Sequence, residues 1–327
     1  MAKQVWQVKA DGVGVRLDKW LADAARLGSR AKAFAALERG KIFIGAVEQR
    51  PPDAGRKLQA GERLTYWEDR PGSSKRQAVF DRQIAGIHIV FEDEALLVLD
   101  KPAGVLTVPL DHPSDSVSLL ERAAEYLTRQ HKRRPQIVHR IDRDTSGLVV
   151  FAKTQAARAE LKKQFMSRQP ERVYQSIVHG CPEPEQGTWR DWLVWDDEEL
   201  RQLAVRAGDP EAQEAICHYQ VLERLGRGER RAALLEVRLV TGKQNQIRVQ
   251  AAQRGHQLVG ERVYLSTPAP RHVIAFARQA LHSHRLAFRH PATHQPVSFE
   301  APLPADFLAL LKKMRLPERP VAPRRQA

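Results

Sequence analysis

The sequence predicts an α+β protein, in which a large domain built on a mixed, largely antiparallel sheet follows a small N-terminal α/β module. Short apolar runs typical of strands outnumber runs with helical periodicity, so a sheet should dominate the large domain. The two kinds of run do not alternate regularly, which argues against a parallel sheet with crossover helices. A polar, turn-rich stretch over residues 70–77 divides the 327-residue chain into a small and a large part.

The first part, residues 1–70, mixes helical and strand-like patterns. The expected elements are helices over residues 15–26 and 29–38 and strands over residues 41–44 and 63–67. Ser29 has the side chain of an N-cap for the second helix, and Gly40 is placed to end it. Residues 71–84 have the composition of a linker.

Residues 85–311 form the large domain in this interpretation. The expected strands cover residues 87–91, 96–99, 148–152, 174–179, 232–240 and 246–250. Helices are expected over residues 116–130 and 155–167, and a helix over 244–254 is the alternative to the last strand. Residues 312–327 carry basic side chains and prolines, so we expect a flexible basic tail.

The charge of the chain favours a polyanionic partner. Lys and Arg total 53 against 39 Asp and Glu, which gives a formal net charge of +14 and a pI near 10.1. Such an excess attracts phosphate groups, so nucleic acid is the leading partner class. A soluble basic protein without such a partner is the alternative.

Cysteine content and hydropathy place the chain in a reducing compartment. Two cysteines, Cys181 and Cys217, are too few for a disulfide framework or a four-thiolate zinc site, and no metal is expected. No apolar run reaches the roughly 18 residues that a membrane span needs. The first residues lack the apolar core of a signal peptide. We therefore expect a cytoplasmic protein without a membrane partner.

Residues 138–153 are the most informative segment. Polar side chains occupy seven of the eight positions from 139 to 146, Gly147 follows, and residues 148–152 are all apolar. A polar loop joined to a buried strand can hold a reactive group in a fixed position. From the residue types alone, a helix cap or a surface turn is a slightly better explanation of the same loop.

HRIDRDTSGL, residues 139–148, resembles the HRLD-x-x-TSG signature of the RluA-type pseudouridine synthases, with Ile141 in place of the usual Leu. Four further segments resemble the same family in the same order, so that the likeness spans about residues 85–300. They are FEDEALLVLDKPAGVLTVP (91–109), RVYQSIVHG (172–180), TGKQNQIRVQAAQRGHQLVGERVY (241–264) and QALHSHRLAFRHP (279–291).

The resemblance implies the pseudouridine synthase fold and the isomerisation of uridine in RNA to pseudouridine. The reaction is redox-neutral, so no cofactor is expected. By motif position, Asp142 is the catalytic carboxylate, Tyr174 lies against the target base, and Arg248 pairs with the aspartate. An adjacent guanidinium would oppose the rise in pKa that burial causes in a carboxyl group.

Other residues of the loop have weaker assignments. Arg140 and Arg143 are expected to contact RNA phosphates or the space that the target base leaves, although Arg143 also fits simple surface charge. Asp144 is interpreted as a structural or capping residue, and His139 as a residue that holds the loop by hydrogen bonds.

Three positions depart from the family pattern. Asn245 and Gln250 stand where the family usually has histidines, and Arg172 replaces the common lysine before Tyr174. Each substitution keeps either hydrogen bonding or charge, so the resemblance still implies activity.

Residues 13–67 resemble the S-four-type RNA-binding domain through RLDKWL, SR-x-KA and a final G-x-x-L. The turn GAVEQR differs from the usual form of that domain. The resemblance implies a basic face for folded RNA, and a solvated helix face is the alternative. The residues of this predicted face are Arg16, Lys19, Arg30, Lys32 and Lys41.

Several hypotheses remain open. RNA is the expected partner, with ribosomal RNA favoured because of the attached module and transfer RNA as the runner-up. A non-catalytic RNA-binding or ribosome-assembly factor is the second hypothesis. A hydrolase that releases uracil is the third. A monomer is expected.

Overall fold

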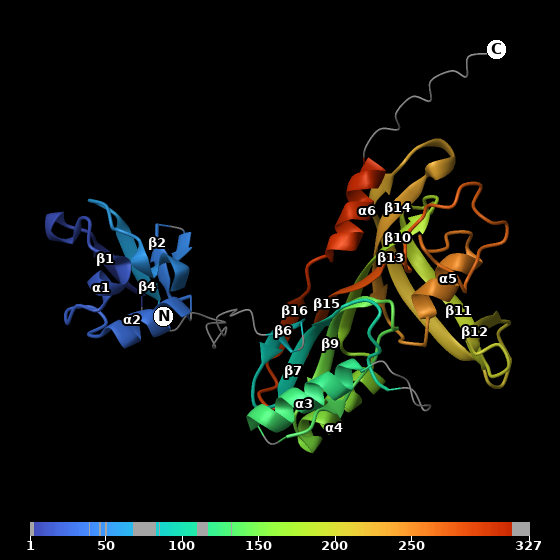
Figure 1. Cartoon of the computed structure of the whole chain (residues 1–327), viewed down its shortest axis with the longest axis horizontal. Helices are drawn as coiled ribbons and strands as arrows, with labels where there is room; N and C mark the ends of the chain where they lie inside the picture. The colour runs from blue at the N-terminus through green and yellow to red at the C-terminus, as the bar shows by residue number, and fades with distance from the viewer. Residues whose placement is uncertain are drawn as a thin grey trace, which may run out of the picture. The chain divides into compact units, whose positions relative to one another are not determined.

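The structure is a computed structural model that describes residues 3–38, 40–45, 47–49, 51–67, 83–84, 86–109, 117–131 and 133–315. The chain divides into two compact units, Met1–Arg82 and Gln83–Ala327, and each unit is described by itself (Figure 1). Within the described residues, no helix is long and apolar enough to cross a membrane.

The N-terminal unit is a four-stranded antiparallel sheet with two short α-helices (Figure 1). Its main elements are β1 (Lys3–Gln7), α1 (Leu17–Leu21), α2 (Arg30–Glu38), β2 (Ile42–Ile44), β3 (Val47–Gln49) and β4 (Arg63–Trp67). The strands lie in the order β1-β4-β2-β3. Leu17 and Trp20 of α1 and Leu37 of α2 belong to one buried core, so the apolar face expected of the first helix is packed.

The ends of these two helices follow from single side chains. The Ser29 hydroxyl accepts a hydrogen bond from the Lys32 amide at 3.2 Å, so Ser29 caps α2 as predicted. The first helix ends at Leu21, earlier than the predicted residue 26. The Asp23 carboxylate accepts a bond from the Ala25 amide at 2.9 Å, and this local bond forms a turn in place of another helical turn.

The C-terminal unit is a 12-stranded sheet with helices packed on it (Figure 1). Its strands are β5 (Gln83–Ile84), β6 (Ile87–Glu92), β7 (Leu96–Lys101), β8 (Gln136–Ile137), β9 (Ser146–Ala152), β10 (Glu171–His179), β11 (Gln186–Asp196), β12 (Arg201–Val205), β13 (Gln213–Leu225), β14 (Ala232–Leu239), β15 (Leu281–Arg289) and β16 (Pro296–Glu300). Its α-helices are α3 (Leu119–His131), α4 (Gln155–Met166), α5 (Gln246–Gln253) and α6 (Ala305–Arg315).

The strand pairing confirms the predicted fold class. The main path runs β12-β11-β13-β14-β10-β15-β9-β7-β6-β5, with β16 on β15 and β8 on β9. Each of these neighbouring pairs is antiparallel except β9 with β15, which is parallel. The sheet is therefore mixed and largely antiparallel.

Three predicted boundaries differ from the structure. Residues 246–250 are not a strand but belong to α5, which confirms the alternative of a helix over 244–254. The Gln246 side chain accepts bonds from the Thr241 hydroxyl and the Lys243 amide just before the helix. Helix α6 continues to Arg315, four residues into the predicted tail, whose remainder, 316–327, lies outside the described residues. Gln83 and Ile84, at the end of the predicted linker, form β5, while residues 71–82 lie outside the described residues.

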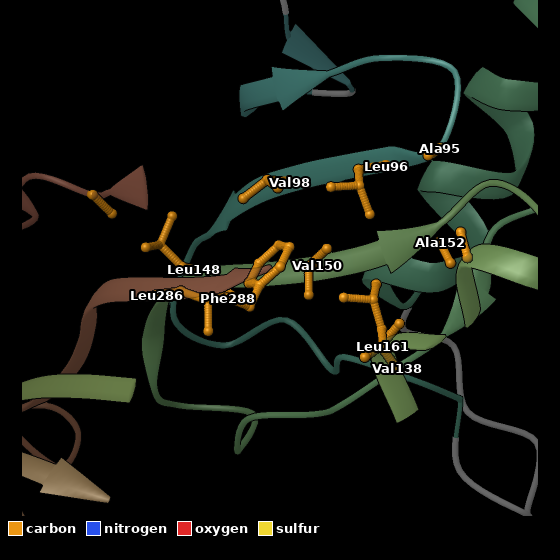
Figure 2. Packing of buried hydrophobic residues seen from close by; sticks show 12 residues of the cluster. Ala95, Leu96, Val98, Val138, Leu148, Val150, Ala152, Leu161, Leu286 and Phe288 are labelled. Carbon is orange, nitrogen blue, oxygen red and sulfur yellow. The ribbon is translucent and has the colours of Figure 1, made fainter. Parts of the chain in front are cut away.

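The central strands are buried on both faces. Leu96 and Val98 of β7 and Val150 of β9 face one core together with Leu161 of α4 (Figure 2). The alternate residues of the same strands face a second core that includes α3. Successive strand residues point to opposite faces, so burial of both faces explains the uninterrupted apolar run over residues 148–152.

The parallel junction between β9 and β15 places the polar loop before β9. Ser146 pairs with His282 and Gly147 with Ser283. Gly147 has φ +108°, and a Cβ there would lie 2.2 Å from the Ser283 carbonyl oxygen. Only glycine fits this close approach. Because Ser283 also pairs with Tyr174 of β10, the loop and Tyr174 reach the same part of the sheet.

Candidate active site

The loop over residues 139–145 is fixed by side chains on both sides of Asp142. The His139 Nε2 atom accepts a hydrogen bond from the Val150 amide at 3.1 Å, and its ring stacks on Phe165. Burial lowers the pKa of His139 to about 3, so the ring is neutral and carries its proton on Nδ1. The Thr107 hydroxyl bonds both the amide and the carbonyl of Ile141, at 3.2 and 2.7 Å.

Lys101, at the end of β7, ties a neighbouring turn to the same loop. Its side chain is fully buried, and Nζ donates to the carbonyl oxygens of Pro102, Val105 and Arg143 at 2.8–3.0 Å. Burial lowers the pKa of Lys101 to about 7, although the nearby charge of Asp142 acts in the opposite direction. The bond to the Arg143 carbonyl holds the backbone directly after Asp142, and the other two bonds hold the turn after β7.

Asp142 faces a cation that a second carboxylate holds. The Arg248 Nη1 atom of α5 lies 3.4 Å from Asp142 Oδ2. The same guanidinium donates two bonds of 2.7 Å to Glu261, whose side chain is fully buried, and one of 3.0 Å to Asn245. The bidentate contact with Glu261 sets the position of Arg248, so only Nη1 is directed at Asp142.

The charges of this group oppose one another. Burial raises the pKa of Asp142, Arg248 and Arg140 act to lower it, and the negative charge of Glu261 adds to the rise. Burial also acts to raise the pKa of Glu261, but its bonds from Arg248 and from backbone amides outweigh burial and lower it. Glu261 therefore stays ionised and keeps Arg248 in place.

Tyr174 of β10 lies beside the aspartate. Its side chain is buried, and burial raises the pKa of the phenol, although the charge of Arg172 and a hydrogen bond with Ser283 act to lower it. The phenol is therefore neutral at ordinary pH. The register between β10 and β15 shifts between Val173 and Tyr174, because His284 of β15 is an extra residue there, so Tyr174 pairs with Ser283.

A pocket of about 480 Å³ opens in front of Asp142, which is large enough for a nucleoside. Asp142 and Tyr174 line it together with the C-terminal end of α4 and residues 239–247. Arg140 is exposed and also lines the pocket. Arg143 does not belong to the described wall of the pocket. Its Nε atom lies 3.6 Å from Asp144 Oδ1 instead.

Comparison with known proteins identifies the family. Residues 95–253 match the family model described as RNA pseudouridylate synthase. The chain is 35% identical to an RNA pseudouridine synthase of Synechocystis sp., over 94% of this chain and 93% of that protein. It is 38% identical to the ribosomal large subunit pseudouridine synthase D of Zymomonas mobilis, over 75% of this chain and 78% of that protein. The chain belongs to the RNA pseudouridine synthase family. Its activity is the isomerisation of uridine in RNA.

Solved structures show that this RNA pseudouridine synthase also has the expected fold. Human RNA pseudouridylate synthase domain containing 4 superposes with a TM-score of 0.57 at 22% identity, over 70% of this chain and 94% of that chain. Human RNA pseudouridylate synthase domain containing 1 superposes with a TM-score of 0.55 at 21% identity, over 68% and 86%.

The residues predicted to bind RNA in the N-terminal unit of the synthase lie on several elements. Arg16, Lys19, Arg30 and Lys32 are exposed, and Lys41 is half-buried before β2. Asp18 draws two of them together, since its carboxylate lies 3.1 Å from the Arg16 guanidinium and 4.0 Å from that of Arg30.

Sequence reasoning missed two residues of the synthase's site. Glu261 lies 13 residues after Arg248, beyond α5, and no helical or strand spacing relates the two. Lys101 stands in the segment that resembles the family, but its buried position at the end of β7 gives it a role that the segment alone did not show. Glu261 also stands in a segment that resembles the family, residues 241–264, but the segment alone did not show its contact with Arg248.

Proposed function

We propose that this synthase modifies uridine in ribosomal RNA and that Asp142 is its catalytic carboxylate. One observation carries the assignment of Asp142: its carboxylate lines a nucleoside-sized pocket and faces Arg248, which Glu261 holds in place. Ribosomal RNA is proposed because several relatives, including those of Zymomonas mobilis and Pseudomonas aeruginosa, are named ribosomal large subunit pseudouridine synthase D. Transfer RNA is the alternative substrate.

The site supports a mechanism in which each of three side chains has one task. The target uridine leaves its stack and enters the pocket, because a base inside a helix cannot reach Asp142. The ionised carboxylate of Asp142 acts as nucleophile or as base while the glycosidic bond breaks. Arg248 keeps that carboxylate ionised and oriented, and the neutral ring of Tyr174 supports the flat face of the uracil.

The outer residues are assigned to the RNA backbone. Arg140, exposed at the wall of the pocket, contacts a phosphate or the space that the flipped base leaves. Arg143 serves a more distant phosphate. The N-terminal unit acts as an S-four-type RNA-binding module through Arg16, Lys19, Arg30, Lys32 and Lys41. With ribosomal RNA as substrate, we propose a cytoplasmic location and a monomeric enzyme.

Mapping the product tests this proposal. Purified protein is incubated with unmodified 16S, 23S and transfer RNA, and pseudouridine is located by chemical adducts that stop reverse transcription. We expect new pseudouridine in 23S RNA with the wild type and none with Asp142→Asn. Pseudouridine found only in transfer RNA would show that transfer RNA, not ribosomal RNA, is the substrate. Undiminished product with Asp142→Asn would show that Asp142 is not the catalytic carboxylate. Released uracil would indicate a hydrolase.

A further inference from the structure

Arg172 is one of four cationic side chains in the described wall of the pocket, with Arg140, Arg168 and Lys243. It has no task in the mechanism proposed for Asp142. It lies two residues before Tyr174 on β10, so both side chains point to the same face of the strand, and both line the pocket. Its Nη2 atom donates one bond of 3.3 Å to the Val240 carbonyl. The buried Nε atom has no hydrogen-bond partner within the described part of the chain.

The position of this guanidinium is fixed by its neighbours. A Cβ on residue 242 would lie 2.2 Å from Arg172 Nη1, so the absence of a side chain at Gly242 makes room for the guanidinium. The Arg172 guanidinium also lies 5.7 Å from the centre of the Phe165 ring, at the end of α4. These contacts place it against the pocket without neutralising its charge.

An unneutralised cation in such a place is costly. Among the described residues, no carboxylate lies within ion-pair distance of Arg172. Burial lowers the pKa of Arg172, although the neighbouring phenol of Tyr174 acts in the opposite direction. A buried charge or donor without a partner is rare in proteins and is usually explained by a ligand or by a catalytic task.

We propose that Arg172 is a further catalytic residue, whose guanidinium donates hydrogen bonds to a carbonyl oxygen of the uracil ring and stabilises the negative charge of the detached ring. This inference rests on the proposed placement of the target uridine in the Asp142 pocket. Arg172 is suited to the task because its donors lie on the same face of β10 as Tyr174, against which the base is placed. A fixed donor directed at developing charge needs little reorganisation during the reaction.

The chemistry requires such a group whichever role Asp142 has. When the N1–C1′ bond breaks, its electron pair stays on N1 and spreads to O2 and O4 of the ring. C1′ then either bonds to a carboxylate oxygen of Asp142, or becomes double-bonded to C2′ after Asp142 removes the proton from C2′. In both routes the ring is an anion until C5 bonds to C1′. In the first route this step breaks the bond between C1′ and the Asp142 oxygen, and in the second Asp142 returns its proton to C2′. The C5 proton is then lost and N1 gains a proton, so no oxidant or reductant is needed.

The test combines an altered enzyme with an altered substrate. The substrate is an RNA oligonucleotide that contains the mapped uridine, or 2-thiouridine or 4-thiouridine at that position. We expect Arg172→Gln to lower the single-turnover rate at saturating enzyme about 100-fold while Kd for the RNA changes little. Sulfur accepts hydrogen bonds weakly, so one of the two thio-substituted RNAs should slow the wild type roughly tenfold and leave Arg172→Gln unaffected.

Two further variants keep the test decisive if Arg172→Gln folds poorly. Arg172→Lys retains the charge but loses the fork of donors, so an intermediate rate is expected. Gly242→Ala displaces the guanidinium without removing it, so this variant should also slow the reaction. The double variant Gly242→Ala/Arg172→Gln should be no slower than Arg172→Gln alone. Arg285→Gln is the matched surface control, because the Arg285 guanidinium pairs with Glu171 outside the pocket.

The outcomes separate this inference from the proposed function. The role of Arg172 alone would be overturned if Arg172→Gln reacted as fast as the wild type at saturating enzyme. It would also be overturned if each thio-substituted RNA slowed the wild type and Arg172→Gln equally. A weaker Kd with a flatter salt dependence and an unchanged rate would assign Arg172 to a phosphate and also overturn the proposal. If the wild type forms no pseudouridine at all, the proposed function fails first.

Discussion

Asp142 shares its cation with a second acid, and this sharing defines the chemistry of the site at the scale of single residues. Arg248 makes two short bonds to Glu261 but only one of 3.4 Å to Asp142. Glu261 thus orients Arg248 and at the same time adds negative charge near Asp142. The arrangement leaves Asp142 with free lone pairs for the substrate, whereas a full bidentate pair with Arg248 would occupy them.

Removing the charge of Arg248 and removing the charge of Glu261 should shift the pH dependence of the rate in opposite directions. Asp142 is active when ionised, so the rate falls as the pH drops through its pKa, which burial raises above the ordinary value. Arg248→Gln removes the cation that lowers this pKa, and the acid limb should move to higher pH. Glu261→Gln removes a charge that raises it, and the limb should move to lower pH. Single-turnover rates between pH 4 and 8 would measure both shifts, and shifts of the same sign would refute these two roles.

His139 should make the folded protein sensitive to acid. Its pKa is about 3 in the folded chain because of burial, whereas an unfolded histidine titrates near 6.5. Between these values only the unfolded state takes up the proton, so the free energy of unfolding falls by about 1.4 kcal/mol for each pH unit below roughly 6.5. His139→Gln keeps an acceptor for the Val150 amide and removes the titration. Between pH 7 and 5 the wild type should lose about 2 kcal/mol more than this variant in urea unfolding.

At the scale of elements, the junction of β9 and β15 connects the catalytic loop with the sheet. The two strands pair in parallel at only two positions, and Gly147 occupies one of them. The loop before β9 is therefore positioned by a short contact in which no side chain fits at residue 147. The aspartate's position depends on this backbone approach as much as on its own hydrogen bonds.

Gly147→Ala should destabilise the C-terminal unit strongly. The new Cβ would meet the Ser283 carbonyl oxygen at 2.2 Å, and the residue would also keep a positive φ. Gly208→Ala is a matched control, because Gly208 has φ +105° but no neighbouring atom within 4 Å. The control should lose about 1–2 kcal/mol of unfolding free energy, and Gly147→Ala at least about 2 kcal/mol more. Equal losses in urea unfolding would show that the close approach does not matter.

The sequence predicted elements with strong local signals and missed those without them. Residues 148–152 are continuously apolar, so β9 was predictable, and Ser29 identified the start of α2. In contrast, β13 has one exposed face, and its mixture of charged and apolar residues shows no clear alternation. The segment QIRVQ in α5 alternates polar and apolar residues, so a strand over 246–250 and a helix over 244–254 both fitted the sequence, and the structure has the helix.

The candidate site was predictable to the extent that local motifs carry it. Asp142, Tyr174 and Arg248 each stand in a segment that resembles the family. In the structure Asp142 and Tyr174 line one pocket, and Arg248 lies 3.4 Å from Asp142. The contact of Glu261 with Arg248, and the lack of a hydrogen-bond partner for Arg172 Nε among the described residues, depend on how segments meet in space. No spacing within the chain contains that information.

At the scale of the whole molecule, the excess of basic residues belongs to a protein that acts on RNA. The chain has a net charge of +14, and the family match establishes an RNA substrate. The Synechocystis relative aligns over 94% of this chain, so the likeness includes most of the N-terminal unit. Two units that both contact RNA would bind it more tightly than either alone, because the second contact is intramolecular.

The contribution of the N-terminal unit can be measured through the salt dependence of RNA binding. Each cation that neutralises a phosphate releases counterions, so the quadruple variant Arg16→Gln/Lys19→Gln/Arg30→Gln/Lys32→Gln should bind RNA more weakly and with a flatter dependence of log K on log salt. The slope should fall by about one for each phosphate that the variant no longer neutralises. Arg16 is expected to contribute least, because Asp18 already pairs with it at 3.1 Å.

The control Lys9→Gln/Arg63→Gln removes exposed charge from other parts of the same unit and should leave the slope nearly unchanged. The single-turnover rate at saturating enzyme should stay at the wild-type value, since Asp142 and its partners all lie in the C-terminal unit. An unchanged slope in the quadruple variant would remove the RNA-binding role of this face and leave RNA binding to the C-terminal unit.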